Sequence, residues 1–150
     1  MPRPPVTIRS LAPQDAPVWR ELWTGYLDFY ETSVSEEVYA TTFARLMGDV
    51  PGDPNGIVAE IDGSVVGLVH YLMHRHTWKI EDICYLQDLY TAPEARGRGV
   101  GRALIEAVYA AADAAGTPSV YWTTQEFNYA GRMLYDRIGV KTPFIKYVRA

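Results

Sequence analysis

The sequence has one cysteine, Cys84, and no long apolar run. A single cysteine excludes an internal disulfide framework and a thiolate-rich metal site, and it fits a reducing compartment. No stretch approaches the roughly 18 apolar residues that cross a bilayer. The opening Met-Pro-Arg-Pro-Pro has no apolar signal region. We therefore expect a soluble, cytoplasmic protein that does not act on membranes.

An excess of positive charge is also missing. Lys and Arg number 14 against 18 Asp and Glu, which gives a net charge of -4. This balance argues against a protein that binds nucleic acid by neutralising phosphates. With 48% hydrophobic and 21% charged residues, the chain is also unlike disordered proteins. Its 150 residues are enough for one core, so we expect a single domain over residues 1–150.

The spacing of apolar residues predicts an α/β fold with a mixed sheet. β-rich runs predict strands over residues 6–9, 57–61, 64–71, 83–90, 119–123 and 145–149. Asp62-Gly63, between the second and third runs, is a strong hairpin signal. Apolar residues at steps of three and four predict helices that follow Asp15 and Ser35, and two more over residues 102–115 and near 129–138. Asp15 is expected to cap the first helix, with Pro17 in its first turn.

The most informative segment is a glycine- and arginine-rich turn between a predicted strand and a predicted helix. Such a turn offers free backbone N–H groups and the positive end of the helix dipole. Glycines let the backbone approach an anion closely. The composition therefore predicts a phosphate or diphosphate cradle, made of Arg96, Gly97, Arg98, Gly99, Val100, Gly101 and Arg102.

Two familiar nucleotide loops do not fit this turn. The Walker pattern needs Gly-Lys-Ser/Thr, which the chain lacks. The dinucleotide pattern G-x-G-x-x-G would need glycine at Arg102 or at Leu104, depending on where it starts. That pattern also belongs to a parallel βαβ unit and not after an antiparallel hairpin.

The turn does fit [R/Q]-x-x-G-x-[G/A], read as RGRGVG. Together with the flanking segments LQDLYTAPEARGRGVG and NYAGRMLYDRIG, it makes the whole chain resemble the GNAT superfamily of acyl-CoA N-acyltransferases. The resemblance implies the GNAT fold, an α/β architecture with a mixed, mostly antiparallel central sheet flanked by helices. The chain looks most like the branch that acetylates polyamines, diamines, thialysine-type amino acids and related small amines.

The resemblance implies acetyl-CoA as co-substrate and assigns a role to each motif. The cradle would bind the pyrophosphate of coenzyme A. Main-chain groups of Leu89, Tyr90 and Thr91 would pair with the pantetheine arm, which Asn128 and Gly131 would also contact. Tyr135 would protonate the departing thiolate, a role that suits a phenol whose pKa lies near 10. Asn128, Gly131 and Tyr135 share one helical face by their spacing.

A protonated amine must lose a proton before it can attack, and the base is not fixed by the sequence. The branch often has a carboxylate where this chain has Gln87, and glutamine cannot act as a base. Asp88 is the catalytic candidate, on the strand face opposite Gln87; Glu126 and Glu81 are alternatives. Desolvation of the amine without a dedicated base is a further possibility.

Aromatic and acidic residues in the first helix suggest where a cationic amine binds. Cation–π contact and ion pairing would suit Tyr26, Asp28, Tyr30 and Glu31, with Gln87 from the strand. An amphipathic helix with a solvated acidic side is the alternative explanation. His74-x-His76 is only a weak metal signal, and we expect no metal site.

We therefore expect an N-acetyltransferase that moves an acetyl group from acetyl-CoA to a primary amine of a small molecule, by direct attack in a ternary complex. Cys84 has no histidine partner at motif spacing and is not expected to act as a nucleophile. A protein lysine or N-terminal acetyltransferase and a non-catalytic acyl-CoA sensor remain as alternatives. The apolar run 144–148 needs a partner, which predicts a homodimer.

Overall fold

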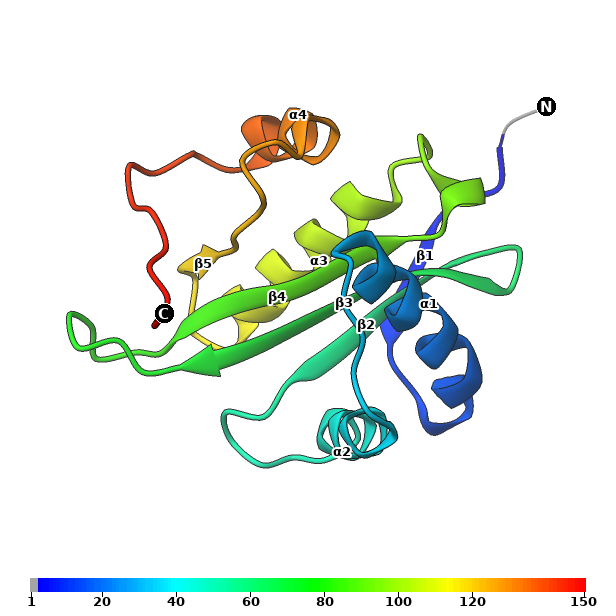
Figure 1. Cartoon of the computed structure of the whole chain (residues 1–150), viewed down its shortest axis with the longest axis horizontal. Coiled ribbons are helices and arrows are strands. Elements are labelled where there is room, and N and C mark those ends of the chain that lie inside the picture. Colours follow the sequence, from blue (N-terminus) through cyan, green and yellow to red (C-terminus); the bar gives the residue numbers. More distant parts are fainter. Residues whose placement is uncertain (1–2) are drawn as a thin grey trace.

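The computed structural model describes residues 3–150 and contains one five-stranded sheet (Figure 1). Neighbouring strands follow the chain in the order β1-β2-β3-β4-β5. The first three pairings are antiparallel, and β4 with β5 is parallel. This confirms the mixed, mostly antiparallel sheet. The strands are β1 Thr7–Ser10, β2 Asn55–Ile61, β3 Ser64–His74, β4 Ile83–Thr91 and β5 Val120–Tyr121.

Helices cover both faces of the sheet (Figure 1). One face carries α1 Ala16–Phe29 and α2 Glu36–Leu46, which bury Trp19, Trp23 and Tyr39 against Val58 and Leu68. The other face carries α3 Val100–Ala114, whose Leu104, Ile105 and Val108 pack on Val69 and Leu86. On that side α4 Tyr129–Ile138 adds Leu134 and Ile138. Short 3-10 turns, η1 Pro13–Asp15 and η2 Pro93–Ala95, precede α1 and α3.

Within residues 3–150, no helix combines the length and the apolar character needed to cross a bilayer.

Local signals in the sequence explain several element boundaries. Asp62 and Gly63 have φ values of 51° and 77°, the left-handed pair that joins β2 to β3 in a tight hairpin. The Ser35 hydroxyl accepts a hydrogen bond from the Val38 N–H and caps α2. The hairpin and the start of a helix after Ser35 confirm the expectations from sequence.

Two local expectations are wrong. Asp15 occupies the position before α1, but its carboxylate does not cap that helix. It accepts two hydrogen bonds from the Arg9 guanidinium and one from the Ala12 N–H, because a fixed cation is a stronger partner than a free amide. The expected strand over 145–149 is also absent: residues 140–150 form no helix or strand and are exposed. β5 is only two residues long and offers this segment almost no ladder to join.

A β-bulge in β4 decides which side chains share a face. His70 of β3 pairs with Asp88, and the next residue, Tyr71, pairs with Leu86, so Gln87 is an extra residue without a partner. Leu86 packs on the α3 side of the sheet, whereas Asp88 contacts His70 on the α1 side. Strict alternation would place both on one face. The bulge therefore turns Asp88 toward α1.

Beyond the bulge, β4 lies at an open edge. β5 pairs with β4 only at Cys84 and Tyr85, and the chain then turns away toward α4 (Figure 1). Residues 86–91 of β4 therefore pair with β3 alone. Backbone groups on the other edge are left to bind a ligand in extended conformation.

Candidate functional site

The glycine- and arginine-rich turn has the backbone that a close anion contact requires. Gly97 and Gly99 both have φ of 79°, a left-handed conformation that other residues adopt only with strain. A Cβ added at either position would meet no atom within 4 Å. The space beside both glycines is therefore open, and Gly99 immediately precedes α3.

Six consecutive backbone N–H groups at this turn are unpaired. In the part of the chain described, the N–H groups of residues 97–102 donate to no backbone or side-chain acceptor. The first helical bond runs from the Ala103 N–H to the Gly99 carbonyl. Free N–H groups and the positive helix end favour an anion here.

The three arginines of the turn are held differently. Arg98 donates to the Pro4 carbonyl at 3.2 Å and is half-buried. Arg102 pairs with Glu106 at 2.8 Å, which offsets its charge. Arg96 is exposed. The residues present therefore fit a diphosphate, with main-chain donors complemented by Arg96 and Arg98.

A close contact between α3 and β3 fixes where the turn lies. A Cβ on Gly67 would come within 2.7 Å of Val100 Cγ1 and 3.1 Å of the Tyr90 carbonyl oxygen. Only glycine at this position lets the first residue of α3 sit directly on the sheet. The N-terminus of α3 is thereby held beside the end of β4 (Figure 1).

Near the bulge, a small cavity brings together side chains from α1, β4, α4 and the segment after β5. Its volume is about 20 Å³, close to that of one water molecule. The lining residues are Tyr26, Tyr30, Leu86, Gln87, Leu89, Trp122, Thr123 and Tyr135. Four of the residues predicted for catalysis or amine binding are therefore neighbours: Tyr26, Tyr30, Gln87 and Tyr135.

Tyr135 extends from α4 into this cavity with a protonated hydroxyl. Its ring meets the Trp122 ring at 5.6 Å with an interplanar angle of 70°. Burial, with a smaller contribution from Tyr30, raises the pKa of Tyr135 to about 12. The hydroxyl is therefore a proton donor at neutral pH, as the sequence interpretation requires.

The rings of Tyr26, in the last turn of α1, and Tyr30, directly after it, are tilted by 58° with centroids 5.0 Å apart. Burial first, and then the charge of Asp88, raises the pKa of Tyr26 far above its ordinary value. Burial likewise raises the pKa of Tyr30. Both phenols remain protonated, and Tyr26 also makes a long 3.5 Å contact with the Gln87 carbonyl oxygen.

Asp88 lies behind the cavity wall instead of lining it. Its carboxylate is 2.8 Å from His70 Nδ1, and His70 Nε2 accepts from the Trp19 indole N–H at 2.9 Å. The Asp88 carboxylate also lies close to the Tyr26 hydroxyl. Tyr26 is thus the link between this carboxylate and the cavity.

Asn128 and Gly131 lie at the start of α4. Asn128 Oδ1 accepts from the Gly131 N–H, and its amide donates to Thr124, so the side chain caps the helix. A Cβ on Gly131 would come within 2.6 Å of Asn128 Nδ2. Gly131 therefore leaves room for this cap, and the pantetheine role of both residues stays a prediction.

Other predicted residues lie outside the cavity. Asp28 and Glu31 are exposed and line no part of it, and Glu81 and Glu126 are also outside the lining. Sequence reasoning missed Trp19, His70 and Trp122 as neighbours of the site. No spacing signal links Trp19 to His70, which are 51 residues apart in the sequence. The bulge that joins His70 to Asp88 has no sequence signature either.

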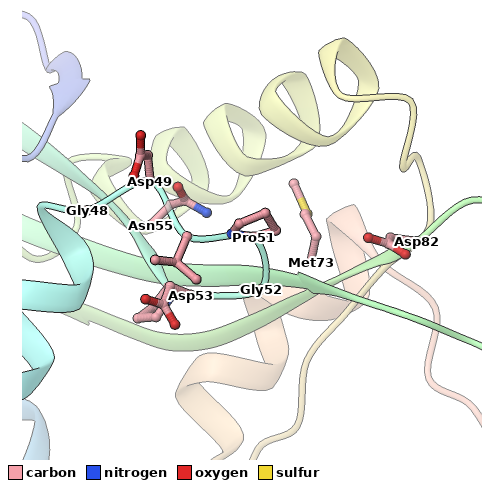
Figure 2. A pocket seen from close by; sticks show the side chains of 10 residues that line it. Gly48, Asp49, Pro51, Gly52, Asp53, Asn55, Met73 and Asp82 are labelled. Atoms are coloured by element: carbon pink, nitrogen blue, oxygen red, sulfur yellow. The ribbon is translucent and has the colours of Figure 1, made fainter.

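The larger hollow of the molecule, about 290 Å³, is not near the turn. It lies under the loop between α2 and β2 and is lined by residues 48–55 with Met73 and Asp82 (Figure 2). Its labelled carboxylates, Asp49, Asp53 and Asp82, point in different directions. Among residues 3–150 there is no group of three or more side chains placed to hold a metal ion.

Comparisons with known proteins agree with this geometry. Residues 18–140 match the model of the acetyltransferase (GNAT) family. A D-amino-acid N-acetyltransferase of Saccharomyces cerevisiae is 37% identical over 145 residues, covering 96% of this chain and 90% of that protein. A thialysine N-epsilon-acetyltransferase of Bos taurus is 31% identical over 117 residues, 78% of this chain and 59% of that protein.

Solved structures share the fold. An aminoglycoside N-acetyltransferase in complex with CoA superposes with a TM-score of 0.82 at 18% identity, covering 100% of this chain and 98% of that one. A ribosomal-protein-alanine N-acetyltransferase from Brucella melitensis biovar Abortus 2308 gives 0.80 at 20% identity, with 97% and 99% covered.

Proposed function

This chain belongs to the acetyltransferase (GNAT) family and is an acetyl-CoA-dependent N-acetyltransferase; on that premise we propose that its acceptor is a small cationic amine of the polyamine or amino-acid type. The observation that carries the proposal is the set of side chains that line the small cavity. They include three half-buried phenols, Tyr26, Tyr30 and Tyr135, with the Asp88 carboxylate behind one of them. Phenol rings and a nearby carboxylate suit an alkylammonium group through cation–π contact and charge.

Acetyl-CoA supplies the acetyl group as a reactive thioester. The residues that would hold it are the turn 96–102 for the diphosphate and the open edge of β4, at Leu89, Tyr90 and Thr91, for the pantetheine amides. The unpaired N–H groups of the turn and the separation of β4 from β5 support this assignment. Asn128 and Gly131 would flank the arm at the start of α4.

Direct transfer needs a proton removed from the amine and a proton given to the thiolate. Tyr135 supplies the second, because its raised pKa keeps the hydroxyl protonated. A thiolate, whose thiol has an ordinary pKa of about 8.5, is a weaker base than a phenolate. The hydroxyl therefore shares or transfers its proton only as the thiolate forms. The proton from the amine passes through Tyr26 to Asp88, which acts as the base. Asp88 thereby replaces the carboxylate that the branch often has at the position of Gln87.

The relatives support the choice of acceptor class. The two curated relatives described above are named for D-amino acids and for thialysine, both of which carry a primary amine. Cys84 is buried and its pKa is raised by burial to about 11, so it is a thiol and not a nucleophilic thiolate. This favours direct attack of the amine over an acyl-enzyme.

The proposed homodimer rests on the C-terminal segment. Phe144, Ile145, Tyr147 and Val148 are each more than three-quarters exposed. An apolar, β-prone segment without a partner in its own chain is an unfavourable surface, and pairing with a second copy would cover it.

The deciding experiment measures uptake of acetyl-CoA by calorimetry and thiol release with spermidine, thialysine, D-alanine and a lysine-containing peptide. We expect binding and turnover with one or more of the three small amines. Turnover of the peptide alone would move the acceptor class to proteins. Binding without turnover of any acceptor would favour a sensor, and no uptake would refute the assignment of the turn.

A further inference from the structure

Trp19, His70 and Asp88 form a hydrogen-bonded row under α1, and the Tyr26 hydroxyl lies close to the end of that row. The indole N–H of Trp19 lies 2.9 Å from His70 Nε2, and His70 Nδ1 lies 2.8 Å from Asp88 Oδ2. At the far end, the Asp88 carboxylate lies close to the Tyr26 hydroxyl, whose own long hydrogen bond runs to the Gln87 carbonyl oxygen at 3.5 Å. Trp19, His70 and Asp88 are 2%, 3% and 9% exposed, so water does not compete for these bonds. The row ends at the cavity because Tyr26 lines it.

The chemistry of the indole fixes the direction of every bond in the row. An indole N–H can only donate, so His70 Nε2 must accept with its lone pair. A neutral imidazole with a bare Nε2 carries its proton on Nδ1, which then donates to Asp88. A second proton on His70 would place two N–H groups face to face and break the bond to Trp19. Trp19 therefore holds His70 in its neutral form.

A neutral histidine leaves the negative charge of Asp88 without a compensating cation. Among residues 3–150, no lysine or arginine lies within 4 Å of this carboxylate. The other titratable groups that face the row are tyrosines: Tyr26 and Tyr30 near the carboxylate, Tyr85 near Tyr26, and Tyr39 against the indole. Arg20, on the outer side of α1, is paired with Glu36.

We propose that Trp19 and His70 are positioning residues that keep Asp88 anionic behind Tyr26, and that this buried charge selects a cationic amine and receives its proton through the Tyr26 hydroxyl. The inference deepens the proposed function and rests on it. A buried charge that lacks a partner favours a ligand that brings the opposite charge into the site. The buried charge of Asp88 therefore discriminates against neutral acceptors.

The proton transfer balances without a further reactant. One N–H bond of the ammonium breaks as its proton moves to the Tyr26 oxygen, and the Tyr26 O–H bond breaks as its proton moves to Asp88. Tyr26 ends neutral, Asp88 ends as a carboxylic acid, and the amine gains the lone pair needed for attack. His70 remains neutral and continues to donate to Asp88 throughout.

The first test observes His70 directly, without any acceptor. We expect nitrogen-15 NMR of the His70 ring at neutral pH to show a proton on Nδ1 and a bare Nε2, the tautomer that the indole N–H requires. In Trp19→Phe, Nε2 has no donor facing it, and signals of an Nε2–H form should appear. Trp78→Phe is the matched control because Trp78 is 83% exposed. A proton on Nε2 in the parent, or an unchanged spectrum in Trp19→Phe, would overturn the proposal.

The second test compares two replacements of His70 of similar size. His70→Asn keeps a donor for Asp88 and can never be charged, whereas His70→Leu removes the donor. Both variants lack Nε2, the acceptor of the Trp19 N–H. We expect kcat/KM for spermidine, thialysine or D-alanine, whichever the parent acetylates best, to fall on the order of a hundredfold in His70→Leu. It should stay within about tenfold of the parent in His70→Asn. Equal values for the two variants would contradict a positioning role.

The pH profile separates this inference from the proposed function. In Trp19→Phe, an imidazolium formed at low pH would neutralise Asp88, so kcat/KM should drop about tenfold more than in Trp78→Phe between pH 8 and 6. Coenzyme A affinity should not change in any of these variants.

If the parent binds coenzyme A and acetylates amines but the variants match it, only the inference fails. If the parent binds no coenzyme A, the proposed function fails first. If Trp19→Phe does not fold, the comparison of His70→Asn with His70→Leu tests the inference.

Discussion

The Tyr135 ring meets the Trp122 ring edge to face, with 5.6 Å between their centroids. This contact fixes the phenol within the cavity, and its hydroxyl has no hydrogen-bond partner among the residues described. Removing that oxygen should therefore change chemistry while leaving packing intact.

We expect Tyr135→Phe to lower kcat by about a hundredfold, within the usual range for loss of a general acid. The affinity for acetyl-CoA, measured by calorimetry, should stay within about twofold because the turn is unchanged. Tyr129→Phe on the same helix is the control, since Tyr129 is 71% exposed. An unchanged kcat in Tyr135→Phe would remove Tyr135 from the reaction.

The raised pKa of Tyr135, about 12, also predicts a pH profile. The acid form is present below this pKa and is lost as the pH rises through it. The alkaline limb of kcat should therefore show no loss from Tyr135 up to about pH 10, where an ordinary tyrosine would already be half ionised. Stopped-flow turnover of the best acceptor at saturating substrate measures it. A fall near pH 8 that vanishes in Tyr135→Phe would contradict this.

Gly99 and Gly116 allow a matched test of the cradle. Both have left-handed backbones, with φ of 79° and 74°, and a Cβ at either would meet no atom within 4 Å. Leucine should cost roughly 1–2 kcal/mol of stability at each position. The two glycines lie at opposite ends of α3. We expect only Gly99→Leu to abolish coenzyme A binding, because its side chain would occupy the space beside the free N–H groups. Equal affinities in the two variants would show that the cradle lies elsewhere.

The pair between Arg9 and Asp15 predicts a pH-dependent stability. Hydrogen bonds from Arg9 lower the pKa of Asp15, and burial opposes them with a smaller effect. A lowered pKa stabilises the fold above the unfolded value of about 3.9, and this contribution is lost as the pH falls through the folded value.

We expect Asp15→Asn to lower the free energy of unfolding at pH 7 by about 2 kcal/mol, measured with urea. The difference from the parent should shrink below about pH 4. Glu21→Gln, an exposed change on α1, should alter stability by less than about 0.5 kcal/mol. A constant difference between pH 7 and pH 3 would count against the ion pair.

The C-terminal segment predicts the oligomeric state. Ile145 is 76% exposed in the single chain, and aspartate there would oppose the pairing of this apolar segment with a second copy. We expect the parent to sediment as a dimer and Ile145→Asp as a monomer. Val140→Asp is the control, since Val140 is 91% exposed and lies outside the run 144–148. A monomeric parent would leave the segment without the proposed role.

Sequence reasoning found the elements whose signals are local. The Asp62-Gly63 hairpin and the start of the helix after Ser35 depend on one or two residues, and both formed as expected. It misread Asp15, because the choice between a helix cap and a guanidinium depends on where β1 places Arg9. It also expected a strand over residues 145–149, which a strand-prone segment forms only when another strand offers it a ladder.

By itself, the sequence determined the mixed α/β fold, the glycine- and arginine-rich turn before a helix, and the family resemblance. These follow from periodicity and from contiguous residues. Only the tertiary structure placed Asp88 behind Tyr26 and joined it to His70 and Trp19. The physical reason is the unpaired Gln87 in β4, which reverses the alternation of side chains after it. Such a shift depends on how two strands pair, and no local pattern of residues encodes it.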